Sequence, residues 1–124
     1  MRDDYVRSFT VTRVIDGDTV AGSLSLGFGL YADWSVRLYG INARELRDPG
    51  GPEARDRLTR MLPAGTKCAV QSAKFDKFSK RVDAILVMPD GSKVNDRLVR
   101  EGWAAPYDGV GPTSDAVPPW PRPS

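Results

Sequence analysis

Two runs of alternating apolar and polar residues, joined by Asp16-Gly17-Asp18, constrain this chain more than any other feature. The first run extends over residues 5–14 and the second over residues 19–26. Alternation with a period of two is typical of strands that bury one face. Asp-Gly favours a tight hairpin turn between such strands, because glycine adopts the positive φ that the turn requires. The pattern predicts a β-hairpin, and on this pattern alone the two aspartates are turn formers.

Composition narrows the chemistry that is open to the chain. Its 124 residues favour one domain, and the net charge of +2 permits an anionic partner without requiring one. There is no histidine, which excludes histidine-ligated zinc and histidine acid–base catalysis. The single cysteine, Cys68, excludes an internal disulfide and lies in an apolar run, so we expect it to be buried. Any catalysis would therefore have to use carboxylates, arginine, lysine, tyrosine or a hard metal ion.

The N-terminal residues and the lengths of the apolar runs allow an expectation about cellular location. Residues 1–4 carry no apolar segment of the signal-peptide kind, and no apolar run is long enough to span a membrane. We expect a monomer that is cytoplasmic as synthesised and has no membrane partner. A phage or mobile-element origin is compatible with the same features.

Three further strands are predicted at residues 34–39, 67–71 and 81–88, and two helices at 52–62 and 94–101. Residues 27–29 and 74–80 are predicted loops, and Leu26 is an expected core residue. This order favours a mainly β fold, an OB-fold five-stranded Greek-key barrel with two to three helices. We expect the barrel to occupy residues 1–105 and a Pro/Gly-rich tail to occupy residues 106–124.

Five short segments, in this order, carry a family resemblance: Val14–Val20, Val36–Glu45, Gly51–Ala54, Asp76–Arg81 and Val94–Gly102. In them the chain resembles the staphylococcal (micrococcal) nuclease-like family, the thermonucleases. The resemblance covers roughly residues 9–104 and fades in the tail. It implies a metal-dependent, sugar-non-specific endonuclease that prefers single-stranded DNA or RNA. Such enzymes cleave the 5′-oxygen bond and leave 3′-phosphate ends.

The resemblance also implies a metal site. Asp18, Asn42 and the backbone carbonyl of Ala43 take the ligand positions, with Asp16 close behind them. Oxygen donors without histidine or cysteine suit a hard cation, so Ca²⁺ is expected, with Mg²⁺ and Mn²⁺ as alternatives. Asn42 stands where the family usually has an aspartate, and the lost negative charge is expected to weaken calcium binding.

Catalytic roles follow from the same resemblance. Arg37 and Arg81 would hold the phosphate oxygens, and Glu45 would take the proton of the attacking water. Lys80 is the alternative to Arg81, because the chain has one extra residue before this position. Substrate contacts are expected from four residues: Lys77, Phe78, Lys80 and Tyr107.

Simpler interpretations stay open for these residues. Arg37 could be an exposed residue of an alternating strand, and Glu45 could pair with Arg44 or Arg47 in a solvated loop. The alternative function is a catalytically weakened barrel that binds nucleic acid or protein. Asn42 favours that alternative, whereas the retained arginines and Glu45 favour the nuclease.

Overall fold

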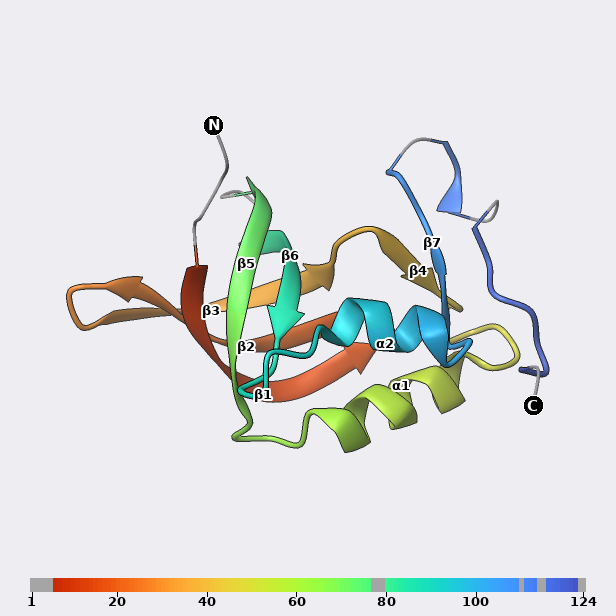
Figure 1. Cartoon of the computed structure of the whole chain (residues 1–124), viewed down its shortest axis with the longest axis horizontal. Coiled ribbons are helices and arrows are strands. Elements are labelled where there is room, and N and C mark those ends of the chain that lie inside the picture. Colours follow the sequence, from red (N-terminus) through yellow and green to blue (C-terminus); the bar gives the residue numbers. More distant parts are fainter. Residues whose placement is uncertain (1–5, 77–79, 110, 114–115, 123–124) are drawn as a thin grey trace.

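The computed structural model describes residues 6–76, 80–109, 111–113 and 116–122. The fold is mainly β, with a closed five-stranded barrel and two helices (Figure 1). The barrel strands are β1 (Val6–Asp16), β2 (Thr19–Gly27), β3 (Leu30–Leu38), β5 (Lys67–Asp76) and β6 (Arg81–Val87). A separate two-stranded sheet is formed by β4 (Ile41–Ala43) and β7 (Ala104–Pro106).

The barrel closes in the strand order β1-β2-β3-β6-β5. The first three strands form an antiparallel meander, β3 then runs parallel to β6, and β5 pairs antiparallel with both β6 and β1. This arrangement is OB-fold-like and confirms the predicted five-stranded barrel. The parallel pairing places Arg37 of β3 beside Asp83 of β6, which matters for the site below.

Helix α1 (Gly51–Met61) packs against β1, and α2 (Val94–Arg100) packs against β6 and β7. Pro52 at the start of α1 suits a first helical turn, where its missing N–H costs nothing. Apolar residues of both helices join the barrel core, as Leu58 and Leu98 show by being fully buried. Neither helix is long and apolar enough to cross a membrane, as far as the described residues go.

A buried amide ties α2 to the barrel. Asn95 accepts a hydrogen bond from the Leu86 N–H at 3.1 Å and donates to the carbonyls of Tyr39 and Ala84 at 2.9 and 3.1 Å. Because the three bonds satisfy its polar atoms, this asparagine can lie 3% exposed in the core. Cys68 is buried as predicted, and burial raises the pKa of its thiol to about 11.

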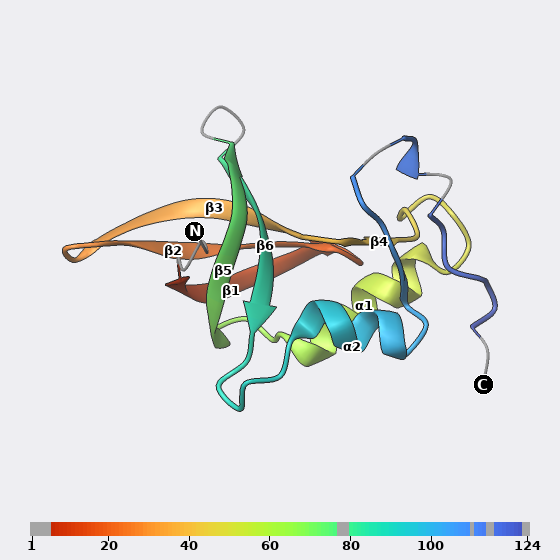
Figure 2. The same ribbon diagram turned by 45° about the horizontal axis from the view of Figure 1, so that its top comes forward.

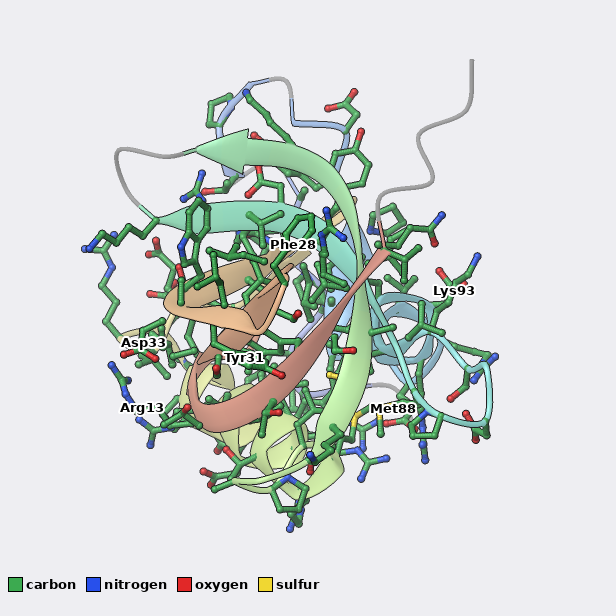
Figure 3. All side chains as sticks on the ribbon, turned by 90° about the vertical axis from the view of Figure 1, so that its left-hand side faces the viewer. Arg13, Phe28, Tyr31, Asp33, Met88 and Lys93 are labelled. Atoms are coloured by element: carbon green, nitrogen blue, oxygen red, sulfur yellow. The ribbon has the colours of Figure 1, made fainter. Side chains whose placement is uncertain are left out.

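Two strands are longer than predicted. β3 begins at Leu30, so residues 27–29 form the tight turn of a projecting hairpin, and all three have positive φ. Figure 3 shows Phe28 and Tyr31 at this hairpin, where Leu26 is exposed and the prediction of a core position is wrong. β5 continues to Asp76, because β6 offers it a pairing partner as far as Arg81. Lys74 is therefore a strand residue.

The C-terminal tail lies along the end of the molecule opposite the projecting hairpin (Figures 1 and 2). Its Trp120 lies with its ring 6.3 Å from that of Trp103, and a Cβ added to Gly50 would come within 2.6 Å of the Trp120 ring. Arg122 stacks its guanidinium 4.1 Å from the centre of the Trp103 ring. The described tail residues after Pro106 thus contact the domain at Trp120 and Arg122 and form no further α-helix or strand.

Candidate functional site

The hairpin turn forms at Asp16-Gly17-Asp18 as predicted, but Gly17 does not adopt the positive φ that was expected of it. The Asp18 N–H donates to the Asp16 carboxylate at 3.0 Å, which closes the turn. Gly17 is buried, and a Cβ there would lie 2.8 Å from the Ala43 Cβ and 2.9 Å from the Ala54 Cβ. Only glycine therefore allows the turn to approach β4 and α1 this closely.

Asp18 is the buried carboxylate of the site, at 7% exposure. Its Oδ2 accepts the Ala43 N–H at 2.9 Å, and its Oδ1 accepts the Thr19 hydroxyl at 3.1 Å. Burial, followed by the adjacent Asp16 carboxyl, raises the pKa of Asp18 to about 6, against the opposing effect of Arg37. Asp18 thus holds β4 against the hairpin turn and titrates near neutral pH.

Arg37 projects from the end of β3 into this cluster. Its Nη1 donates to the carbonyls of Leu38 and Ile41 at 2.8 and 2.9 Å. Its Nη2 lies 3.3 Å from Asn42 Oδ1 and 3.5 Å from Asp18 Oδ2. With a side chain only 20% exposed and four oxygen neighbours, Arg37 is fixed in place and is not a free surface residue.

The side-chain amide of Asn42 is hydrogen-bonded to the C-terminal tail. Its Nδ2 donates to the carbonyls of Thr113 and Ala116, both at 3.1 Å, while Oδ1 faces Arg37. The NH₂ group of asparagine can donate to both carbonyls, whereas an aspartate carboxylate can donate to neither, which accounts for asparagine at a position where the resemblance suggests aspartate. Arg44 adds a second tie, because its Nη1 donates to the Pro118 carbonyl at 2.7 Å.

Two of the predicted metal ligands, Asp18 and Asn42, contact the same guanidinium nitrogen of Arg37. Asp18 and Asn42 both supply oxygen atoms, and the N–H of Ala43 binds Asp18 directly. Oxygen donors of this kind suit a hard divalent ion. No group of three acidic, cysteine or histidine side chains arranged for a metal occurs in the described part of the chain. A divalent ion that bound Asp18 Oδ2 and Asn42 Oδ1 would compete with Arg37 Nη2 for both oxygen atoms.

Arg37 and Arg81 line one pocket of about 560 Å³. Arg81 lies on β6, its side chain is 46% exposed, and its Nε is 3.2 Å from Asp83 Oδ1. Tyr107 lines the same pocket and donates its hydroxyl to the Gly111 carbonyl at 2.7 Å. The structure therefore brings together three of the predicted residues. Lys80, the alternative to Arg81, is exposed and does not line the pocket.

Glu45 lies in a neighbouring pocket of about 290 Å³, together with Asn42 and Ala43. Its carboxylate is exposed and pairs with Arg47 at 2.9 Å, as the simpler interpretation expected. Thr113 of the tail lines both this pocket and the Arg37 pocket. The predicted base and the predicted arginine pair thus line two different pockets that adjoin at Thr113.

Sequence reasoning missed three charged residues of the Arg37 pocket: Lys74, Asp83 and Asp108. The alternation Arg81-x-Asp83 on β6 could have indicated Asp83, because residues two apart share a face. Lys74 was missed because its strand was predicted to end at Gln71. Lys77 and Phe78 lie outside the described residues.

Comparison with known proteins adds no relative: no family model matches the chain, and no curated protein is significantly similar to it. The likeness to the thermonucleases thus remains an expectation that rests on the five segments of the sequence. What the chain can do has to be argued from the geometry of the site.

Proposed function

We propose that the protein is a metal-dependent nuclease that hydrolyses phosphodiester bonds of DNA and RNA, with single strands preferred. The observation that carries the proposal is the pocket shared by Arg37 and Arg81, on the neighbouring parallel strands β3 and β6. The Asp18 carboxylate contacts Arg37 of this pocket, and the Asp16 carboxylate accepts the Asp18 N–H. Arginine pairs suit phosphate because each guanidinium can offer two parallel N–H donors.

In this proposal Arg37 and Arg81 hold the non-bridging oxygens of the scissile phosphate. Two backbone carbonyls hold Nη1 of Arg37 at the pocket, and its Nη2 leaves Asp18 and Asn42 when it turns to the phosphate. Arg81 is released from Asp83 when it turns to the phosphate, and Lys74 on β5 adds positive charge to the same pocket. Negative charge that develops on the phosphate oxygens is thereby stabilised.

Glu45 is the candidate base, and it must leave Arg47 to accept a proton from water. Asp18 and Asp16, with Asn42 and the Ala43 carbonyl, would hold the metal ion once Arg37 has moved to the phosphate. A bound Ca²⁺ would act as a Lewis acid on the phosphate oxygens.

A second function is favoured by one specific observation. Thr113 lies between the Arg37 pocket and the Glu45 pocket, and Asn42 fixes the tail there. A barrel in which the tail permanently separates the base from the arginines would bind nucleic acid without cleaving it. This is the weakened, binding-module alternative.

Incubation of the purified protein with denatured DNA separates the two functions. The nuclease proposal expects cleavage in millimolar Ca²⁺ that a chelator abolishes. The alternative expects salt-dependent binding without cleavage in Ca²⁺, Mg²⁺ or Mn²⁺. Glu45→Gln is the loss-of-function variant, and Glu53→Gln, an exposed glutamate in the first turn of α1, is its matched control.

A further inference from the structure

A groove at the C-terminal ends of α1 and α2 concentrates positive charge away from the Arg37 pocket. It has a volume of about 800 Å³ and shares no lining residue with the Arg37 pocket. The two helices lie side by side in both views (Figures 1 and 2). We call it the arginine groove, and its charged and aromatic lining is Arg57, Arg60, Arg100, Glu101, Trp103 and Arg122.

Two of these arginines are held in place by other groups of the groove. Arg57 forms a two-pronged pair with Glu101, with N–O distances of 2.9 and 3.0 Å. Arg122 lies over the Trp103 ring at 4.1 Å and donates to the Glu101 carbonyl. Guanidinium groups fixed in this way lose little side-chain entropy when an anion binds.

The other two arginines extend the positive charge into solvent. Arg60 and Arg100 are exposed, and neither has a carboxylate within ion-pair distance in the described part of the chain. Four arginines face one glutamate in the groove, an excess of three positive charges in a chain with a net charge of only +2. The groove therefore carries more net positive charge than the whole chain, which favours an anionic partner at this surface.

The chemistry of the groove fits a chain of phosphates. Arginine forks match the geometry of phosphate oxygens, and a concave surface admits a strand better than it admits a flat bilayer. The Trp103 ring carries Arg122 over its face and has Trp120 beside it, so the two aromatic rings help to hold this arginine at the groove. We propose that the arginine groove is a second nucleic-acid site, which binds the phosphate backbone of single strands independently of the Arg37 pocket.

Salt-dependent binding of a fluorescein-labelled oligothymidylate, measured in chelator so that no cleavage occurs, tests the site. The variant is Arg60→Glu/Arg100→Glu, and the control is Arg13→Glu/Lys93→Glu. The control changes the net charge equally at two exposed residues, labelled in Figure 3, that do not line the groove. Loss of two phosphate contacts should reduce the slope of log K against log salt concentration by about 1.4 for a single strand. The control should leave the slope unchanged.

An equal slope for groove variant and control overturns the proposal, and so does wild-type protein that does not bind the oligonucleotide. Binding of anionic vesicles that needs the groove arginines, with oligonucleotide binding that does not, overturns it in favour of a membrane surface. Failure of the proposed nuclease function is a separate result: groove-dependent binding would persist while no metal supports cleavage. Circular dichroism of both variants checks that each is folded.

Discussion

The side-chain amide of Asn42 donates to the backbone carbonyl of Thr113 at 3.1 Å, and so joins the predicted metal edge to the C-terminal tail. The same nitrogen reaches the Ala116 carbonyl. Asn42→Asp replaces this donor by acceptors that face two carbonyls. We expect it to lower the free energy of unfolding by about 1–3 kcal/mol, as for other buried groups left without partners. Chemical denaturation measures the loss, and faster hydrogen exchange in residues 116–122 would locate it in the tail.

Asn42→Asp should also bind metal more tightly, although it lowers the stability of the fold. Asn42→Asp adds a negative charge beside Asp18, and more ligand charge tightens calcium sites. We therefore expect tighter Ca²⁺ binding in the variant by isothermal titration, although its fold is less stable. Weaker binding, or no change, would show that position 42 is not a ligand.

Asp18 should make the metal-free protein less stable as pH rises. Burial raises its pKa from 3.8 to about 6, so between these values the folded protein keeps a proton that the unfolded chain has released. Stability is then lost as pH increases through this window, by up to about 3 kcal/mol at 1.36 kcal/mol per pKa unit. Urea denaturation between pH 4.5 and 7.5, in chelator, should show the decline in wild type and not in Asp18→Asn. Stability that rises over this range in wild type would contradict the assignment.

Glu101 should make the protein less stable as pH falls below 4.5, a trend opposite to that expected from Asp18. The hydrogen bonds from Arg57, and then those from Arg97, lower the pKa of Glu101 from 4.5 to about 2. Its contribution is present above pH 4.5 and is lost as pH falls toward 2. Because the carboxylate is 27% exposed, we expect about 2 kcal/mol after allowance for solvent screening. In Glu101→Gln, the part of the stability loss below pH 4.5 that comes from protonation of Glu101 should be absent.

Arg81 and Lys80 provide a matched pair for the phosphate-holding role. Arg81 lines the pocket with Arg37, whereas its neighbour Lys80 does not. Arg81→Gln should lower kcat/KM for denatured DNA by about 10²–10³, as removal of a transition-state donor does elsewhere. Lys80→Gln should change it by less than a few-fold. Equal effects would assign the arginine a general electrostatic role and count against the proposed site.

Much of the fold could be predicted from the sequence because its signals are local. Alternation identified β1 and β2, Asp-Gly identified their turn, and the apolar stripes identified both helices. Strand ends were missed where pairing decides them: β3 and β5 extend because a partner strand is available, which no local pattern reports.

The site was only partly predictable for the same reason. The cluster of Arg37 with Asp18 and Asn42 could be predicted because all three residues lie near strand ends. The structure brings them together. The tie between Asn42 and the tail, 71 residues away from it at Thr113, has no signal in either segment alone. Consequently the sequence could not show that Glu45 and the arginines line two different pockets that adjoin at the tail.

The most direct test of the proposed function is calcium-dependent cleavage of a short single-stranded oligonucleotide, with the product ends assigned by mass spectrometry. We predict cleavage in Ca²⁺ that stops on addition of chelator, with 3′-phosphate and 5′-hydroxyl ends, and a rate that falls by about 10²–10⁴ in Glu45→Gln. No chelator-sensitive cleavage with Ca²⁺, Mg²⁺ or Mn²⁺, from protein that is folded and pure, would contradict it.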